Sequence, residues 1–545
     1  MQGDRLLVVA ALGLAVASAC SPPQQDTMLV RNAIVDAGGE TLQGVVLDAD
    51  SELAVYRGIP YAAPPKANRR WRPPAAHTPR SGTQDASKFA PACPQLQGNH
   101  DWYRRVAVLF GNPRDTIGRL ENIDEDCLYL NVWTSAKPAT EKQPVMVWLH
   151  GGSNINGYGH EPNNRGHAIA EHGIVFVSIN YRLGVLGFMA HAGLGAESPH
   201  GVSGNYALLD QIAALQWIQQ NIRAFGGDPD NVTVIGESSG GYNIAWLVAS
   251  QMAEGLFRRA IIQSGGWAVN SFQTLEQAEQ VGESIASSLG MEKPLSPVEI
   301  VEAMRELDWE NVLDGANTAY SGWYDAVTDG YFLTAPAASL FAQGEFKNVD
   351  LLIGANANER YMYLAEDVDE VDLDEMVAEH AGTHKDELSA ILKQTSHPGI
   401  RRVMDRLGSR GDGYLCASKY IAGAMAKKNQ NVFFYFFTRI RPGGKKTLAY
   451  HGAEIPYALG TADDWLPGDK IDLQLSDTMM QYWVNFAATG SPNGAGLPAW
   501  PAYSVDDQNY LELGDSISSE TKLETEICAI LDQRRTEILI NMNER

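Results

Sequence analysis

The most diagnostic stretch of the chain is Val232-Thr233-Val234-Ile235-Gly236-Glu237-Ser238-Ser239-Gly240. Its first four residues are apolar or β-branched and predict a buried strand, and the residues after Gly240 predict a helix. A serine between two glycines, where a strand turns into a helix, is typical of a nucleophile elbow, because bulky residues beside the serine would clash in so sharp a turn. The turn holds the serine clear of the sheet, near a helix N-terminus that favours developing negative charge. Ser238 is therefore the candidate nucleophile.

Strand and helix patterns alternate along the chain. The clearest helical pattern runs from Ala207 to Phe225 and ends at Gly226-Gly227. Such alternation favours an α/β fold with a large, mostly parallel sheet and helices on both faces. Residues 270 to 330 and 364 to 430 are helix-rich, so we interpret them as insertions beside that sheet. The continuous apolar runs that predict buried strands are 145–149, 174–179, 232–235, 351–353 and 432–437.

Composition limits the classes of partner. The chain has 545 residues, of which 42 are basic and 66 are acidic, and its formal net charge is -24. Such a surface repels nucleic acid and anionic membranes, and it favours neutral or cationic ligands only in a general way. The candidate active-site segments lie hundreds of residues apart, which indicates one catalytic domain over residues 29 to 545.

The N-terminus is typical of an export signal. Arg5 precedes an apolar run from Leu6 to Ala19 that is too short to span a bilayer. We expect residues 1 to 19 to be a signal peptide and residues 20 to 28 to be a tether. Cys20 is either the acylated cysteine of a lipoprotein or an incidental residue of a plain secreted protein. The protein is thus expected to be exported, as a periplasmic, outer-membrane-anchored or secreted protein, and a lipid on Cys20 would be its only membrane attachment.

The remaining cysteines fit an exported protein. With Cys20 set aside, four remain: Cys93, Cys127, Cys416 and Cys528. Four cysteines allow three pairings, and the sequence alone does not choose among them.

An acid and a base follow the serine in the order that a serine nucleophile needs. Glu359 comes soon after the predicted strand 351–353, and His451 follows the strand 432–437 after a loop. Parallel strands place catalytic groups just beyond their carboxyl ends. The order of nucleophile, acid and base along the chain is that of the nucleophile-elbow enzymes. On spacing alone, Glu359 could still be an ordinary surface carboxylate in a turn.

A glycine loop precedes the elbow. The predicted strand 145–149 runs directly into His150-Gly151-Gly152-Ser153. Adjacent glycines let backbone N–H groups point at a developing oxyanion without interference from side chains. The N–H group of Ser239, which follows the nucleophile, would complete the oxyanion hole. We expect His150 to shape this loop rather than act as a base.

Many ordered motifs show a resemblance between about residues 57 and 503. The chain resembles the type B carboxylesterases, the branch of the α/β-hydrolase superfamily that includes the cholinesterases, and it looks like a bacterial secreted or lipoprotein member. The matching motifs, besides the elbow, are Arg57-Gly58-Ile59-Pro60-Tyr61-Ala62, Glu125-Asp126-Cys127-Leu128-Tyr129-Leu130-Asn131, Asn180-Tyr181-Arg182, Gly187-Phe188, Gly204-Asn205 with Asp210-Gln211, Phe225-Gly226-Gly227-Asp228-Pro229, Gln263-Ser264-Gly265, Trp483 with Asn485-Phe486-Ala487, and Trp500-Pro501.

The resemblance implies an α/β-hydrolase fold and roles for specific residues. It implies a catalytic triad of Ser238, Glu359 and His451, whose chemistry needs no cofactor. No metal is expected, because the sequence has no H-E-x-x-H motif. It also implies oxyanion-hole N–H groups from Gly152, Ser153 and Ser239, with Gly151 in the same loop. Glu237 would point into the site beside the serine, and Ser264 would lie behind the triad. The disulfides implied are Cys93–Cys127, over the active-site gorge, and Cys416–Cys528, at the C-terminal helix.

The chain departs from the family pattern at several positions. Ser153 stands where the family commonly has a third glycine, and Arg360 follows the acid where glycine is usual. The stretch that carries the cation-binding tryptophan of cholinesterases has no aromatic residue here, and Trp102 lies far upstream of it. This argues against choline esters as substrates. Candidates for the wall of an acyl pocket are Trp267, Trp323 and Tyr324.

The sequence therefore predicts a serine carboxylic-ester hydrolase that forms an acyl-enzyme with a neutral, small-to-medium ester. Its expected partner is a small-molecule ester, with no nucleic acid. A lipase with interfacial preference and a specialised degrader of one complex ester are the enzymatic alternatives. The alternative of another class is a catalytically inactive adhesion protein on the same fold, although such proteins lose triad residues that this chain keeps.

Overall fold

The structure is a computed structural model that describes residues 32–48, 53–96, 98–135, 142–291, 294–394, 399–461 and 465–543. The expected signal peptide over residues 1 to 19, the tether over residues 20 to 28 and Cys20 lie outside these residues. None of the described helices is both long enough and apolar enough to span a lipid bilayer.

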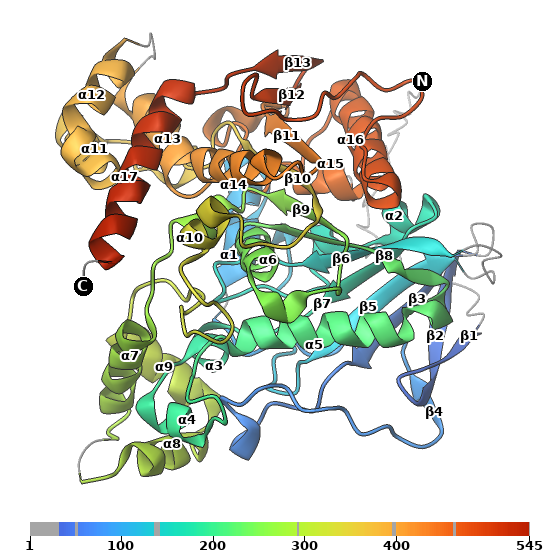
Figure 1. Cartoon of the computed structure of the whole chain (residues 1–545). Helices are drawn as coiled ribbons and strands as arrows, with labels where there is room; N and C mark the ends of the chain where they lie inside the picture. The colour runs from blue at the N-terminus through green and yellow to red at the C-terminus, as the bar shows by residue number, and fades with distance from the viewer. Residues whose placement is uncertain are drawn as a thin grey trace, which may run out of the picture.

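The described strands form one mixed sheet (Figure 1). Its strand order is β1-β2-β3-β5-β7-β6-β8-β9-β10-β11-β12-β13, with β4 beside β2. The central strands from β7 to β12 run parallel, and the strands at both ends pair antiparallel. The strands are β1 Asn32–Ala37, β2 Glu40–Asp48, β3 Leu53–Pro60, β4 Thr83–Asp85, β5 Tyr129–Ser135, β6 Gln143–Leu149, β7 Val175–Ile179, β8 Gly227–Glu237, β9 Arg259–Gln263, β10 Asp350–Asn356, β11 Val432–Phe437, β12 Asn509–Leu513 and β13 Ile517–Thr521.

Helices cover both faces of this sheet and extend beyond one side of it (Figure 1). The helices are α1 Gly98–Leu109, α2 His167–Glu171, α3 Gly184–Phe188, α4 Ala192–Glu197, α5 Tyr206–Asn221, α6 Ser239–Ala249, α7 Leu275–Ser288, α8 Pro297–Arg305, α9 Trp309–Ala319, α10 Ala337–Gln343, α11 Glu370–Ala381, α12 Lys385–Lys393, α13 Ile400–Gly411, α14 Leu415–Lys427, α15 Ile455–Leu459, α16 Lys470–Thr489 and α17 Thr525–Asn543.

The central strands are buried on both faces. Val145, Val147 and Leu149 of β6 join the core that α5, α6 and α14 cover. Met146 and Trp148 of the same strand join the core under α2, α15 and α16. Side chains alternate across a strand, so both sets must be apolar, and this explains the continuous apolar runs in the sequence.

The parallel α/β sheet predicted from the sequence is confirmed. The five predicted strands lie within β6, β7, β8, β10 and β11, and the predicted helix 207–225 is α5 followed by a 3₁₀ turn at Ile222–Phe225. The sequence pattern missed the antiparallel strands at the two edges and the parallel strands β9 and β12. β13, for example, has no fully buried residue, so no apolar run marks it.

Two groups of helices lie beside the sheet. Helices α7, α8 and α9 form one group, and α11, α12, α13 and α17 share a core of their own (Figure 1). The structure contains both disulfides that the resemblance implied, Cys93–Cys127 and Cys416–Cys528. The second disulfide joins α14 to α17 and so connects the C-terminal helix to a helix that covers the sheet.

Candidate active site

The elbow holds Ser238 in a strained conformation between β8 and α6. Its φ of 53° and ψ of -124° are rare for a residue with a side chain. The flanking glycines are sterically required. A Cβ at Gly240 would lie 2.0 Å from the carbonyl oxygen of Leu149, and one at Gly236 would lie 2.7 Å from the carbonyl carbon of Gly240. The G-x-S-x-G pattern is therefore a packing requirement of the β8–α6 turn.

Three side chains from distant parts of the chain form a continuous hydrogen-bond chain. His451 Nε2 lies 2.8 Å from the Oγ of Ser238, and His451 Nδ1 lies 2.7 Å from Oε2 of Glu359. The Glu359 side chain is fully buried. With the Nδ1 proton donated to the carboxylate, Nε2 is free to accept the serine proton. The arrangement can therefore activate the hydroxyl as a nucleophile.

The second oxygen of Glu359 is also held. Its Oε1 accepts hydrogen bonds from the Ser264 hydroxyl and from the backbone N–H of Asn356, both at 2.6 Å. Ser264 thus lies behind the triad, as the resemblance implied. These two donors fix the carboxylate so that its other oxygen points at His451.

The glycine loop runs alongside the nucleophile. Gly152 has a φ of 109°, and its Cβ would lie 2.1 Å from the carbonyl oxygen of Asn156, so only glycine fits. Ser153, where the family commonly has glycine, also has positive φ, at 56°. In the described part of the chain, the N–H groups of Gly152 and Ser153 have no hydrogen-bond partner. Ser239 begins α6, so its N–H group is one of those that no helical carbonyl satisfies.

His150 shapes this loop. Its ring stacks on Tyr181 at 4.3 Å, and its Nδ1 lies 2.8 Å from the carbonyl oxygen of Gly151. Burial lowers the pKa of His150 to about 4, so the ring is neutral and Nδ1 donates. The contact fixes the start of the glycine loop.

Glu237 places a second carboxyl group at the triad. Its Oε1 lies 3.3 Å from His451 Nε2, and its Oε2 would lie 2.9 Å from a Cβ on Gly151. Burial raises the pKa of Glu237, and the nearby carboxylates of Glu454 and Glu359 raise it further. Burial would lower the pKa of His451, but the carboxylates of Glu237 and Glu359 outweigh it and raise that pKa. The two groups therefore titrate as a pair.

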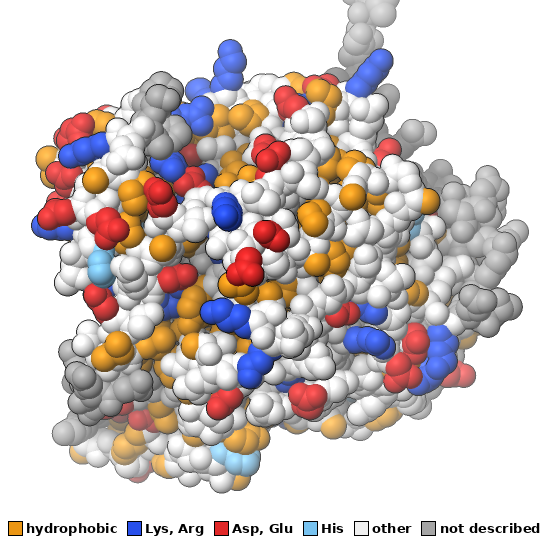
Figure 2. All heavy atoms as spheres, turned by 45° about the horizontal axis from the view of Figure 1, so that its top comes forward, with side chains coloured by type: hydrophobic (Ala, Val, Ile, Leu, Met, Phe, Trp, Pro, Cys, Tyr) orange, Lys and Arg blue, Asp and Glu red, His pale blue; other side chains and the backbone are white. Residues whose placement is uncertain are grey.

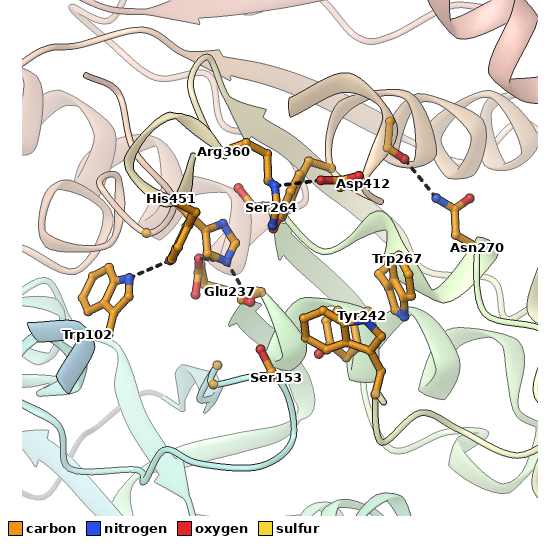
Figure 3. A pocket seen from close by; sticks show the side chains of 18 of the residues that line it. Trp102, Ser153, Glu237, Tyr242, Ser264, Trp267, Asn270, Arg360, Asp412 and His451 are labelled. Atoms are coloured by element: carbon orange, nitrogen blue, oxygen red, sulfur yellow. Dashed lines mark hydrogen bonds and ion pairs between the residues drawn. The ribbon is translucent and has the colours of Figure 1, made fainter. Parts of the chain in front are cut away.

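A cavity of about 950 Å³ opens onto these residues. In Figure 3, Trp102 lies on one side of His451, Tyr242 and Trp267 lie on the other, and Ser153 lies below. Trp267 donates its indole N–H to Asp325 at 2.9 Å and lies 6.1 Å from the exposed ring of Trp323. The cavity therefore has room for an ester with substantial groups on both sides of the carbonyl.

Two expectations for the cavity wall need correction. Trp267 and Trp323 line the cavity, but the side chain of Tyr324 is buried and does not. Trp102, set aside on its sequence position, does line the cavity, where it lies against Gly452 and donates to the Tyr363 hydroxyl at 2.9 Å. Helix α1 brings Trp102 next to the triad. The position of Trp102 far upstream in the sequence is therefore no argument against choline esters as substrates.

A serine elbow on a mixed α/β sheet, a hydrogen-bonded Ser–His–Glu chain and an adjacent glycine loop define a serine hydrolase with the α/β-hydrolase fold. Comparison with known proteins supports the same class of enzyme. The sequence model of the Carboxylesterase family matches residues 31–531. The chain belongs to this family, and it is an ester-hydrolysing enzyme.

Individual relatives cover most of the chain. Fumonisin B1 esterase of Sphingopyxis macrogoltabida is 33% identical over 476 residues, which are 85% of this chain and 84% of that protein. Phenmedipham hydrolase of Pseudarthrobacter oxydans is 30% identical over 85% of this chain and 92% of its own length. The crystal structure of a Geobacillus stearothermophilus carboxylesterase superposes with a TM-score of 0.78 at 28% identity, covering 92% of this chain and all of that one.

Proposed function

We propose that the protein hydrolyses carboxylic esters through an acyl-enzyme on Ser238, with His451 as the general base and Glu359 as the orienting acid. The observation that carries this proposal is the unbroken hydrogen-bond chain from Ser238 Oγ through His451 to Glu359. The strained backbone of Ser238 and the buried carboxylate of Glu359 support it, because such costly features are typical of active sites.

The proposed reaction has two halves. Ser238 attacks the ester carbonyl while His451 takes its proton, and the N–H groups of Gly152, Ser153 and Ser239 stabilise the oxyanion. His451 then gives the proton to the leaving alcohol, which departs from the acyl-enzyme. In the second half His451 removes a proton from water, which attacks the acyl group and releases the acid. Glu359 keeps the imidazole in the useful tautomer throughout.

The intact Ser–His–Glu chain argues against the adhesion-protein alternative, and the family relatives that hydrolyse esters argue in the same direction. We propose a neutral, small-to-medium ester as the default substrate. A lipase would show a jump in rate when the substrate concentration crosses its solubility limit, so a concentration series tests that alternative.

We also propose that the protein is exported and acts outside the cytoplasm. Its two disulfides support this, because stable disulfides form in oxidising compartments. Mass spectrometry of the protein isolated from cells would show whether residues 1 to 19 are removed and whether Cys20 carries a lipid.

The function is tested with p-nitrophenyl esters of increasing acyl length. We expect the purified protein to hydrolyse the short esters, and Ser238→Ala to lose about a million-fold in kcat. Ser284→Ala, in the exposed face of α7, is the matched control and should behave as the parent protein. A p-nitrophenyl phosphonate should add one phosphonyl group, on the peptide that contains Ser238. A folded parent protein that neither hydrolyses these esters nor becomes labelled would contradict the proposal.

A further inference from the structure

Two arginines flank one tyrosine in the wall of the active-site cavity. The guanidinium carbons of Arg105 and Arg360 lie 5.4 Å and 5.9 Å from the centre of the Tyr363 ring. Arg105 comes from α1, and Arg360 directly follows the triad acid Glu359, where the family usually has glycine. All three residues line the cavity. The arginine at position 360, where the family usually has glycine, thus places a second cation near Arg105.

This pair carries more positive charge than its neighbours neutralise. Arg360 Nε lies 2.8 Å from Asp412 Oδ2 (Figure 3). The other oxygen of Asp412 contacts His380 Nε2 at 2.5 Å, so Arg360 and His380 share one carboxylate. Arg105 donates to the backbone carbonyl of Met362. Among the described residues, no carboxylate forms an ion pair with Arg105. One wall of the cavity therefore has an unneutralised cation.

The other charged side chains of the wall, apart from Glu379, have partners of their own. Asp101 pairs with Arg104 and Arg114, which lie outside the cavity wall. Glu161 is buried and accepts hydrogen bonds from Tyr103 and from the backbone of Tyr158.

Two further arginines of the wall, on α17, have partners of their own. Arg534 pairs with Glu537, and Arg535 bonds Asn270 and Asp532. Glu379 is exposed and is the only acidic side chain of the wall, among the described residues, that has neither an ion pair nor a hydrogen bond to its carboxylate.

The arginine pair lines the same cavity as Ser238. Trp102, which donates to the Tyr363 hydroxyl, lies against Gly452, the neighbour of His451. On the Arg360 side, Tyr414 lies next to the Arg360 side chain, and its ring lies 5.0 Å from the ring of His451. By these contacts, Tyr414 alone separates Arg360 from His451, whereas Tyr363 and Trp102 lie between Arg105 and Gly452.

We propose that Arg105 and Arg360 bind a carboxylate group carried by the ester substrate, in its acid half or its alcohol half. This inference rests on the proposed function and narrows its substrate class. A guanidinium presents a planar fork of N–H donors that matches a carboxylate, and the bond is strengthened by charge. The protein as a whole has a formal net charge of -24 and so repels anions, although acidic and basic side chains are interspersed on the face that Figure 2 shows. The two arginines in the cavity wall, of which Arg105 is exposed, supply the local attraction that such a substrate needs.

Matched ester pairs test the inference on the purified full-length protein. The first pair is 4-acetoxybenzoate and 4-acetoxybenzamide, which differ only in a carboxylate or an amide on the alcohol half. The second pair is monomethyl adipate and the methyl ester of adipamic acid, which differ in the acid half. We expect kcat/KM for the carboxylate member to exceed that for the amide member about tenfold or more in at least one pair. Added salt should lower this ratio.

Three variants distinguish binding from a general loss of activity. Arg105→Gln and Arg360→Gln should each lower the carboxylate-to-amide ratio of kcat/KM by about tenfold, because each removes one charge-assisted hydrogen-bond donor. Arg223→Gln is the matched control. It removes the same charge from an exposed ion pair with Asp230, and it should leave the ratio unchanged.

Three results would overturn the inference. The first is equal kcat/KM for the carboxylate and amide members of both pairs in the parent protein. The second is hydrolysis of p-nitrophenyl esters without cleavage of either carboxylate ester. The third is a carboxylate-to-amide ratio that neither arginine substitution changes. Absence of all ester hydrolysis, including that of p-nitrophenyl esters, would instead be the failure of the proposed function.

Discussion

The carboxyl oxygen Oε1 of Glu237 lies 3.3 Å from Nε2 of His451, the same nitrogen that lies 2.8 Å from the Ser238 hydroxyl. The base of the triad thus faces both the nucleophile and a second buried acid. The pair can hold one proton in two ways, on the glutamic acid or on the imidazole. Only the state with a neutral imidazole can accept the serine proton.

Replacing Glu237 should therefore change the pH dependence of the reaction. A glutamate charge beside His451 raises the pKa of His451, so the imidazole becomes neutral, and active, only as the pH rises. In Glu237→Gln that charge is absent, the pKa of His451 falls, and the acidic limb of the kcat/KM profile should move to lower pH by about one pH unit. Hydrolysis of p-nitrophenyl acetate from about pH 5 to pH 10 measures this. An unmoved acidic limb would show that the two groups do not share a proton.

The glycine loop offers a matched pair of substitutions. Gly152→Ala should lower kcat by about 100-fold to 1,000-fold, because its Cβ would lie 2.1 Å from the Asn156 carbonyl oxygen and displace the N–H donors of the oxyanion hole. Ser153→Gly keeps its N–H group and relieves a positive φ, so its kcat should stay within about threefold of the parent value. Steady-state kinetics on one short ester compares the two. Equal losses in both would exclude backbone donation as the function of this loop.

Ser264 should act as a positioning residue through Glu359. Ser264→Ala removes one of the two donors to Glu359 Oε1 and leaves the Asn356 N–H in place. We expect kcat to fall about tenfold with KM nearly unchanged, far less than the loss of about 10⁴-fold expected for Glu359→Gln. Thermal unfolding of the variant is the control for a general structural defect. A rise in KM with unchanged kcat would contradict the positioning role.

The disulfide between α14 and α17 should stabilise the cavity wall as well as the fold. It closes a loop of 112 residues, and α17 contributes Leu531, Arg534 and Arg535 to the cavity. The double variant Cys416→Ala/Cys528→Ala should lose about 2–4 kcal/mol in the free energy of unfolding. KM should rise more than kcat falls, since the triad lies on other elements. Denaturant unfolding and ester kinetics measure the two effects, and unchanged stability would contradict the prediction.

The elbow and the parallel strands could be predicted because local rules govern them. The turn at Ser238 admits only glycine two positions before and two positions after the serine. Strands buried on both faces must be continuously apolar. Both requirements leave a local signature in the sequence. The edge strand β13 leaves none, because solvent on its exposed side permits polar residues. Glu359 and His451 could be predicted from their order along the chain after Ser238. A carboxylate after a strand is common, however, so spacing alone did not distinguish a catalytic acid from a surface carboxylate.

The walls of the cavity depended on packing between distant segments. The sequence indicates the class of enzyme, through the elbow, the glycine loop and the order of the triad. It carried no sign that Trp102 lies against Gly452, or that Arg105 meets Arg360 at Tyr363. Trp102 and Arg105 lie more than 250 positions before these partners, and no periodicity connects them. Catalytic groups sit on turns whose geometry is locally constrained, whereas substrate-binding groups meet only when separate helices and loops pack together.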